Sequence, residues 1–244
     1  MAAGKQDSRQ KMINMMYLVF IAMLALNISK EVLATLGILN EDIENSIKSK
    51  SEKSNELYGV FAQNSENPSY FFANEWAPVI KDATNQYFDF VQSLKDTLLL
   101  DEFGKNKYKK VIIVKDGPNR NDTLLITNFQ TMDKSIELDD MFFEGNNYDS
   151  LGLVYVNRFK SYSTLMKSVI DSIVSKENSL TVKRTPHDFS ISKDLINRSF
   201  NFKDSVVNSE GTIQPYLDYN FKGFPKIASL SKLTKLQSDI RELE

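Results

Sequence analysis

The N-terminal part of the chain holds the strongest hydrophobic pattern. The run Met12–Ile28 has no charged residue. As a helix it would rise about 25 Å, slightly less than the roughly 30 Å hydrocarbon core of a bilayer. Lys5, Arg9 and Lys11 precede the run, whereas acidic residues predominate after it. By the positive-inside rule, this asymmetry puts the N-terminus in the cytoplasm and the rest of the chain outside.

This run fits either a retained membrane helix or the apolar region of a cleaved signal peptide. A signal-peptide cleavage site needs small residues at positions −3 and −1. A cut after Ala25 puts Met23 at −3, and a cut after Ser29 puts Asn27 there, so the sequence favours a retained helix. The expected organisation is a cytoplasmic tail at 1–11, a transmembrane helix at 12–34 and a helical domain outside the membrane at 35–244.

Mostly small or polar residues form one stripe along this helix, at Asn14, Leu18, Ala22, Ala25 and Ser29. Such a stripe lets a second membrane helix approach closely, which predicts a homodimer. The alternative is that alanine is simply common in membrane helices.

Arg9 stands at the edge of the predicted span, and Tyr17 lies about 80° from it around the helix. One interpretation of Arg9 is a topology signal whose side chain reaches the headgroups. The other is an ion pair with a partner's buried carboxylate, because ionisable groups at membrane depth are costly and tend to be functional. The pattern leaves both open.

Beyond the span the hydrophobic period is helical. It continues through Val32, Leu33, Leu36, Leu39, Ile43 and Ile47, and no Gly or Pro interrupts the polar residues 44–56. The span is therefore expected to run into the soluble domain as one stiff rod. Three further amphipathic helices are predicted near 74–100, 148–177 and 226–243. Long helices joined by loops indicate a mainly α fold, a helical bundle.

The stretch 108–130 breaks the helical pattern. Val111–Val114 and Thr123–Phe129 are rich in β-forming residues, and they flank a turn sequence containing Asp-Gly-Pro-Asn. This arrangement predicts a small β-hairpin inserted into the bundle.

Composition and motifs give no support for an enzyme. A net charge of −2 argues against a generic nucleic-acid binder, and the absence of Cys excludes thiol chemistry. There is no phosphate-binding loop, metalloprotease motif or hydrolase motif. His187 lies in a loop sequence where Asp188 could orient its ring, but no nucleophile accompanies it. We expect no catalytic residue, no cofactor and no metal.

Two segments are specific enough to indicate a family. The first comprises Arg9–Asn14, Met16–Asn27 and Ser29–Leu33, and the second comprises Tyr216–Leu217, Phe221–Pro225, Ile227–Ser229 and Lys232–Leu233. Both closely resemble the GldM/PorM family, the inner-membrane subunits of the gliding-motility and type IX secretion motor. Two features depart from the family pattern. They are Asp7, which puts a carboxylate near Arg9, and the stretch 108–130.

The resemblance implies a bacterial inner-membrane protein with one membrane helix, a helical first periplasmic domain and further β-rich domains beyond this chain. It implies a homodimer inside a ring of GldL-like subunits, each with two membrane helices and a buried glutamate. Proton flow would rotate the homodimer and the surrounding ring of GldL-like subunits relative to each other. Arg9 would pair with that glutamate, Tyr17 would be a polar group inside the ring, and further partners would be periplasmic and outer-membrane secretion components.

Three hypotheses remain at this stage. The chain is a force-transmitting motor subunit, a static single-pass anchor that presents a helical binding module, or a secreted helical binding protein with a cleaved signal peptide. A static anchor should tolerate substitution of Arg9 and Tyr17, and the mass of the mature N-terminus separates the third hypothesis from the others.

Overall fold

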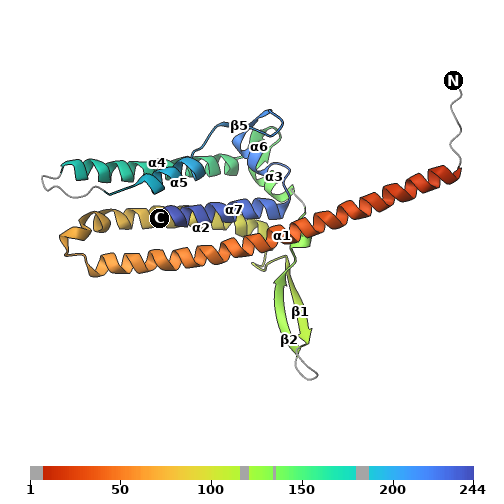
Figure 1. Ribbon diagram of the computed structural model, residues 1–244, viewed down its shortest axis with the longest axis horizontal. Coiled ribbons are helices and arrows are strands. Elements are labelled where there is room, and N and C mark those ends of the chain that lie inside the picture. The colour runs from red at the N-terminus through yellow and green to blue at the C-terminus, as the bar shows by residue number, and fades with distance from the viewer. Residues whose placement is uncertain (1–7, 116–120, 134–135, 180–186) are drawn as a thin grey trace.

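The computed structural model describes residues 8–115, 121–133, 136–179 and 187–244, and it is mainly helical (Figure 1). The helices are α1 (Ser8–Gln63), α2 (Phe71–Leu99), α3 (Ile136–Phe142), α4 (Ser150–Ser179), α5 (Ser190–Ser199), α6 (Tyr216–Phe221) and α7 (Lys226–Leu243), with 3-10 turns η1 (Pro68–Tyr70) and η2 (Phe129–Thr131). The described strands pair antiparallel as β1 (Lys109–Lys115) with β2 (Asn121–Thr127), β3 (Phe143–Glu144) with β4 (Asn147–Tyr148), and β5 (Ser205–Val207) with β6 (Ile213–Pro215).

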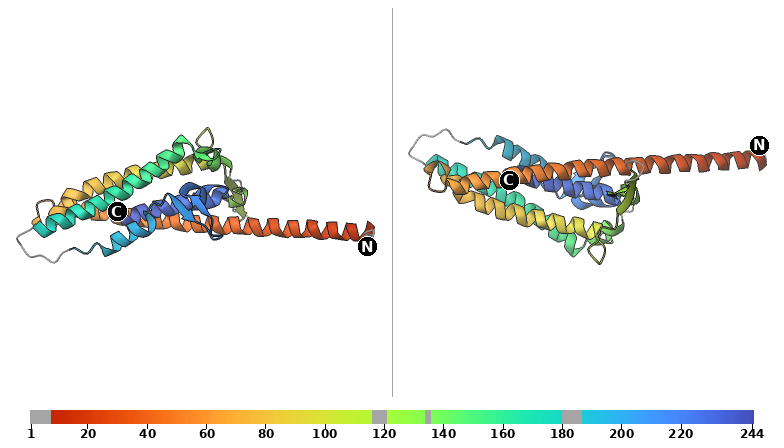
Figure 2. Two further views of the ribbon diagram at one scale, coloured as in Figure 1. Left: turned by 90° about the horizontal axis from the view of Figure 1, so that it is seen from above. Right: turned by 90° about the horizontal axis from the view of Figure 1, so that it is seen from below.

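Helix α1 is unbroken from Ser8 to Gln63, which confirms the predicted rod. Its C-terminal half lies in the bundle, and its N-terminal half projects away from it (Figures 1 and 2). The reversal into α2 follows from Pro68, which disfavours helix in the residue before it. Asn67 accepts a hydrogen bond from the Ser69 backbone N–H at 3.0 Å and so caps η1.

Helix α7 holds the bundle together, because α1, α2 and α5 all pack on it. It runs parallel to α1: Ile227 packs in the same cluster as Leu33, and Lys50 Nζ hydrogen-bonds Ser238 Oγ at 2.9 Å. Helices α2 and α4 lie side by side on the other side of the bundle (Figure 2). The predicted helices 74–100, 148–177 and 226–243 are confirmed as α2, α4 and α7.

The main core is rich in aromatic rings. Phe142, Tyr155 and Phe221 form a triangle whose ring centroids lie 5.4 to 5.7 Å apart. Such contacts stabilise beyond the apolar area that they bury. Helices α3 and α6, which the sequence did not predict, supply Phe142 and Phe221 to this core.

The predicted apolar stripe on α1 is partly wrong. Leu33 and Ile47 are buried, but Val32 and Leu39 are 52% and 51% exposed. The buried face of the helix also contains Asn40, at 3% exposure. The reason is that α7 and α2 cover α1 along a strip that includes polar positions. Asn40 donates to Glu44 of the same helix, and its Oδ1 has no hydrogen-bond partner among the described residues.

The two strands of the hairpin predicted at 108–130 are confirmed, and its predicted turn sequence Asp-Gly-Pro-Asn lies outside the described residues. Strands β1 and β2 pair from Lys109↔Thr127 to Lys115↔Asn121. The hairpin projects sideways from the bundle at the point where α1 leaves it (Figure 1).

Candidate functional site

The N-terminal half of α1 is the first candidate site, because it presents a large apolar surface that the rest of the chain does not cover. Every large apolar residue from Met12 to Ile21 is exposed, from 46% for Ile13 to 71% for Met15. Burying such side chains is worth about 1.5–3 kcal/mol each. A segment of this kind gains free energy when a bilayer or another apolar surface covers it.

The predicted site residues lie on this projecting segment. Arg9, Asn14, Leu18 and Ala22 are exposed, and Tyr17 is 64% exposed. Gln10 Nε2 donates to Asn14 Oδ1 at 3.3 Å. Ala25 and Ser29 belong to α1, but their side chains lie outside the described residues. In the part of the chain that is described, no helix has both the length and the apolar character that a membrane span requires.

The neck, where α1 enters the bundle, is held by a small apolar cluster. Leu33 packs there with Met132, Ile227 and Leu230, all of them buried. Phe129 of η2 lies against the backbone of Gly37, in the space that a Cβ atom would occupy. The neck therefore joins α1, α7 and the end of the hairpin in one contact.

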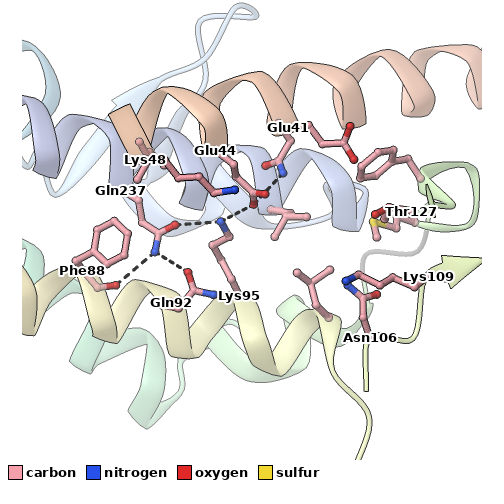
Figure 3. A pocket seen from close by; sticks show the side chains of 16 residues that line it. Glu41, Glu44, Lys48, Phe88, Gln92, Lys95, Asn106, Lys109, Thr127 and Gln237 are labelled. Atoms are coloured by element: carbon pink, nitrogen blue, oxygen red, sulfur yellow. Dashed lines mark hydrogen bonds and ion pairs between the residues drawn. The ribbon is translucent and has the colours of Figure 1, made fainter. Parts of the chain in front are cut away.

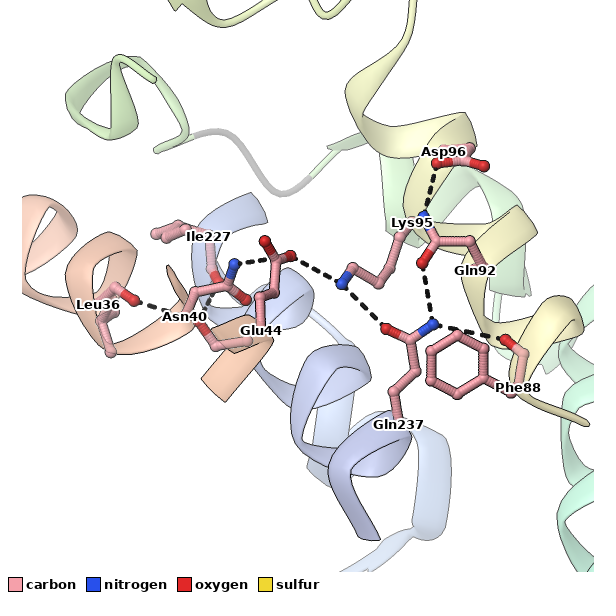
Figure 4. A network of polar contacts seen from close by, with 10 residues as sticks. Leu36, Asn40, Glu44, Phe88, Gln92, Lys95, Asp96, Ile227 and Gln237 are labelled. Carbon is pink, nitrogen blue, oxygen red and sulfur yellow. Dashed lines mark hydrogen bonds and ion pairs between the residues drawn. The ribbon is translucent and has the colours of Figure 1, made fainter. Parts of the chain in front are cut away.

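A polar network follows the neck along α1 (Figure 4). Lys95 Nζ of α2 donates to Glu44 Oε1 of α1 at 2.9 Å and to Gln237 Oε1 of α7 at 3.0 Å. Gln237 Nε2 in turn donates to Gln92 Oε1 at 3.0 Å, and Asn40 Nδ2 donates to Glu44 Oε1 at 3.2 Å. The Lys95 side chain is 4% exposed, so its charge is compensated inside the bundle rather than by water.

Two further contacts fasten the far part of α1 to α7. Lys50 Nζ bonds Ser238 Oγ and Glu242 Oε2, both at 2.9 Å, and Tyr58 Oη donates to Glu244 Oε1 at 3.0 Å. The Lys50 ammonium holds the pKa of the Glu242 carboxyl below its usual value. Helix α1 is thus attached to α7 at several positions from Leu33 to Tyr58.

One family model matches the chain, that of the GldM N-terminal domain, over residues 31–244. The chain belongs to the GldM family. No curated protein matches it. Membership in the GldM family connects the chain with the gliding and type IX secretion machinery. The matched region contains the bundle, the neck and the hairpin. Arg9, Tyr17 and most of the segment with the N-terminal resemblance precede it.

Sequence reasoning selected the N-terminal residues of this GldM-family chain as candidates and did not select Lys95 or Gln237. A weak signal was present, because Lys95 directly follows Leu94 and lies between the apolar positions Val91 and Leu98. A lysine at the border of an apolar helix face usually extends to water. Lys95 becomes a buried, paired charge only because α1 and α7 pack against α2 at this position.

The loop histidine has a different partner from the one predicted. His187 Nδ1 pairs with Glu177 of α4, whereas Asp188 accepts hydrogen bonds from Ser190 N at 2.9 Å and Ser190 Oγ at 3.0 Å. These bonds hold the pKa of the Asp188 carboxyl below its usual value. Asp188 therefore stabilises the start of α5 rather than orienting the imidazole.

Proposed function

We propose that this chain is the membrane-proximal part of an inner-membrane motor subunit. As a homodimer within a ring of GldL-like subunits, it converts proton motive force into rotation that drives type IX secretion and gliding. One observation carries the proposal: a single helix joins an exposed apolar segment to a bundle that holds it at several positions from Leu33 to Tyr58. The N-terminus is cytoplasmic and the bundle periplasmic in this proposal.

The geometry of α1 suits the transmission of torque. The helix is unbroken over 56 residues, about 84 Å at 1.5 Å per residue. The neck cluster, Glu44 with Lys95, and Lys50 with Glu242 resist its rotation within the bundle. A turn applied near Tyr17 would therefore reach α7 without a flexible joint.

Arg9 is proposed as the group that couples ion flow to rotation. A membrane carboxylate near a fixed guanidinium favours its charged form, and away from it burial favours the protonated form. Protonation and release could then move Arg9 from one carboxylate of the ring to the next. One elementary charge crossing 100 mV is worth about 2.3 kcal/mol, comparable with a modest change in ion pairing.

The dimer is proposed to form along the exposed side of α1. Asn14, Leu18 and Ala22 are exposed on the projecting half. Val32 and Leu39, 52% and 51% exposed, lie beyond the apolar run on the same side of the helix. Contact between two copies at these positions would cover apolar surface that the single chain leaves open.

The test is to replace Arg9 by Ala and by Lys in the full-length protein, and to measure gliding, secretion and co-purification of the ring partner. The matched control is Lys11→Ala, which removes a positive charge from another face of the same helix. An energy-converting Arg9 predicts loss of both activities in Arg9→Ala with the complex intact, no rescue by Lys, and normal function of the control. Normal function of Arg9→Ala would instead favour the static anchor.

A further inference from the structure

A second site lies beside the polar network, in a cavity of about 420 Å³ between α1, α2, α7 and the base of the hairpin (Figure 3). Its apolar wall includes Ile47, Phe88 and Leu230, and Asn106 and Thr127 stand at the end nearest the hairpin. Elements distant in the sequence thus enclose one space. Such concave sites with a few convergent polar groups are typical of ligand-binding pockets.

Lys95 supplies the buried charge of this cavity. An ammonium has three N–H donors, and Lys95 uses one on Glu44 and one on Gln237. Among the described residues its third donor has no hydrogen-bond partner. A buried donor left unpaired is destabilising, and an anionic oxygen that enters the cavity would remove that cost.

Two more lysines reach the cavity from different elements. Lys48 of α1 approaches from the side of Lys95, and Lys109 of β1 extends from the opposite end, beside Asn106 (Figure 3). Within the described part of the chain neither forms an ion pair. The acidic groups on the wall are Glu44, which is paired with Lys95, and Glu41. The cavity therefore offers positive charge at both of its ends, with an apolar wall between them.

We propose that this cavity binds an acidic peptide segment that carries two carboxylates. One carboxylate would pair with Lys48 and the free donor of Lys95, and the other with Lys109 and the amide of Asn106. The aliphatic stems would cover Phe88 and Leu230, and Glu41 would accept a backbone N–H of the peptide. Bound in this way, the segment ties the hairpin to the bundle. The inference does not depend on the proposed motor function.

The experiment measures binding of a fluorescein-labelled peptide, Gly-Glu-Leu-Glu-Gly amide, to the full chain in detergent by fluorescence anisotropy. The control peptide carries Gln in place of Glu. The decisive variants are Lys109→Gln and its neighbour Lys110→Gln. Successive residues of a strand face opposite sides, so only the first removes a charge from the cavity. Lys48→Gln is matched in the same way with Lys53→Gln, an exposed lysine elsewhere on α1.

The expected result is that the Glu peptide binds and the Gln peptide does not. Lys48→Gln and Lys109→Gln should each weaken binding about tenfold, the size of one lost charge-assisted hydrogen bond, and both matched controls should stay within about twofold. Unchanged helical circular dichroism of each variant shows that the fold is kept. Absence of binding overturns the proposal. Equal losses in Lys109→Gln and Lys110→Gln also overturn it, because they indicate general attraction to a basic surface.

Discussion

The ring of Phe129 lies against the backbone of Gly37, in the space that any side chain at position 37 would fill. This contact brings η2, which directly follows the hairpin, onto α1 at the neck. Gly37 is therefore needed for the close approach of two segments rather than for an unusual backbone angle. At this position the segment that follows the hairpin comes closest to the axis of α1, next to the apolar cluster of Leu33 and Met132.

Gly37→Ala should destabilise the chain even though alanine is the better helix former. The added methyl group overlaps the Phe129 ring, and overpacking of this kind costs about 1–3 kcal/mol. Gly59→Ala on the same helix is the matched control, because nothing lies within 4 Å of its added Cβ. That variant should gain about 0.5–1 kcal/mol. Urea denaturation followed by circular dichroism measures both, and a stabilised Gly37→Ala would contradict the tight contact.

Lys95→Met should cost about 1–3 kcal/mol of unfolding free energy. Methionine keeps the apolar stem but leaves Glu44 and Gln237 without their common donor. The comparison is Lys176→Met, which removes the surface pair of Lys176 with Glu75, whose side chains are 45% and 34% exposed. Exposed pairs are worth only about 0–1 kcal/mol. Equal denaturation midpoints for the two variants would mean that the network adds no stability.

The chain should lose stability as the pH rises above about 10. Burial raises the pKa of several tyrosines above the ordinary value of 10.0, to about 12 for Tyr216, and the same direction holds for Tyr58, Tyr87, Tyr155 and Tyr162. The unfolded chain releases these protons first, so the stability that they contribute is complete below pH 10 and is lost above it. Denaturation midpoints between pH 9 and 12 test this, and Tyr216→Phe should lessen the fall.

Between pH 8 and 10 a half-buried lysine should act in the opposite direction. Burial lowers the pKa of Lys232 from 10.5 to about 8, although its ammonium lies 4.2 Å from the centre of the Phe224 ring. Above pH 8 the folded chain has lost this proton while the unfolded chain still binds it, so stability rises with pH. Lys232→Met should remove the rise. A wild-type midpoint that stays flat from pH 8 to 10 would show that the ring, together with the Asn220 carbonyl that accepts from Lys232 Nζ at 2.6 Å, keeps the ammonium charged.

The amphipathic helices could be predicted from the sequence because their signal is local. Tyr87, Leu94 and Leu98 repeat at helical spacing, and all three are buried in α2. Helices α3 and α6 were missed because Ile136–Phe142 and Tyr216–Phe221 are too short for a period to stand out. Their rings enter the core only because the longer helices leave room for them.

The two candidate sites also differ in whether the sequence alone could indicate them. Arg9 could be selected from its charge beside an uncharged run, and Tyr17, which lies inside that run, from the resemblance to the GldM/PorM family. The cavity with Lys48, Lys95 and Lys109 could not, because these residues come from α1, α2 and β1. No spacing along the chain brings them together.

The sequence by itself determined the four long helices, the hairpin strands, the charge asymmetry around Met12–Ile28 and the resemblance to the GldM family, since each depends on residues close together in the chain. Only the tertiary structure decided which face of α1 is buried. Lys50 of α1 meets Ser238 of α7 across 188 positions, and Glu44 of α1 meets Lys95 of α2 across 51. Long-range packing, rather than local helix preference, therefore determined both how the bundle holds α1 and where the cavity beside α1 forms.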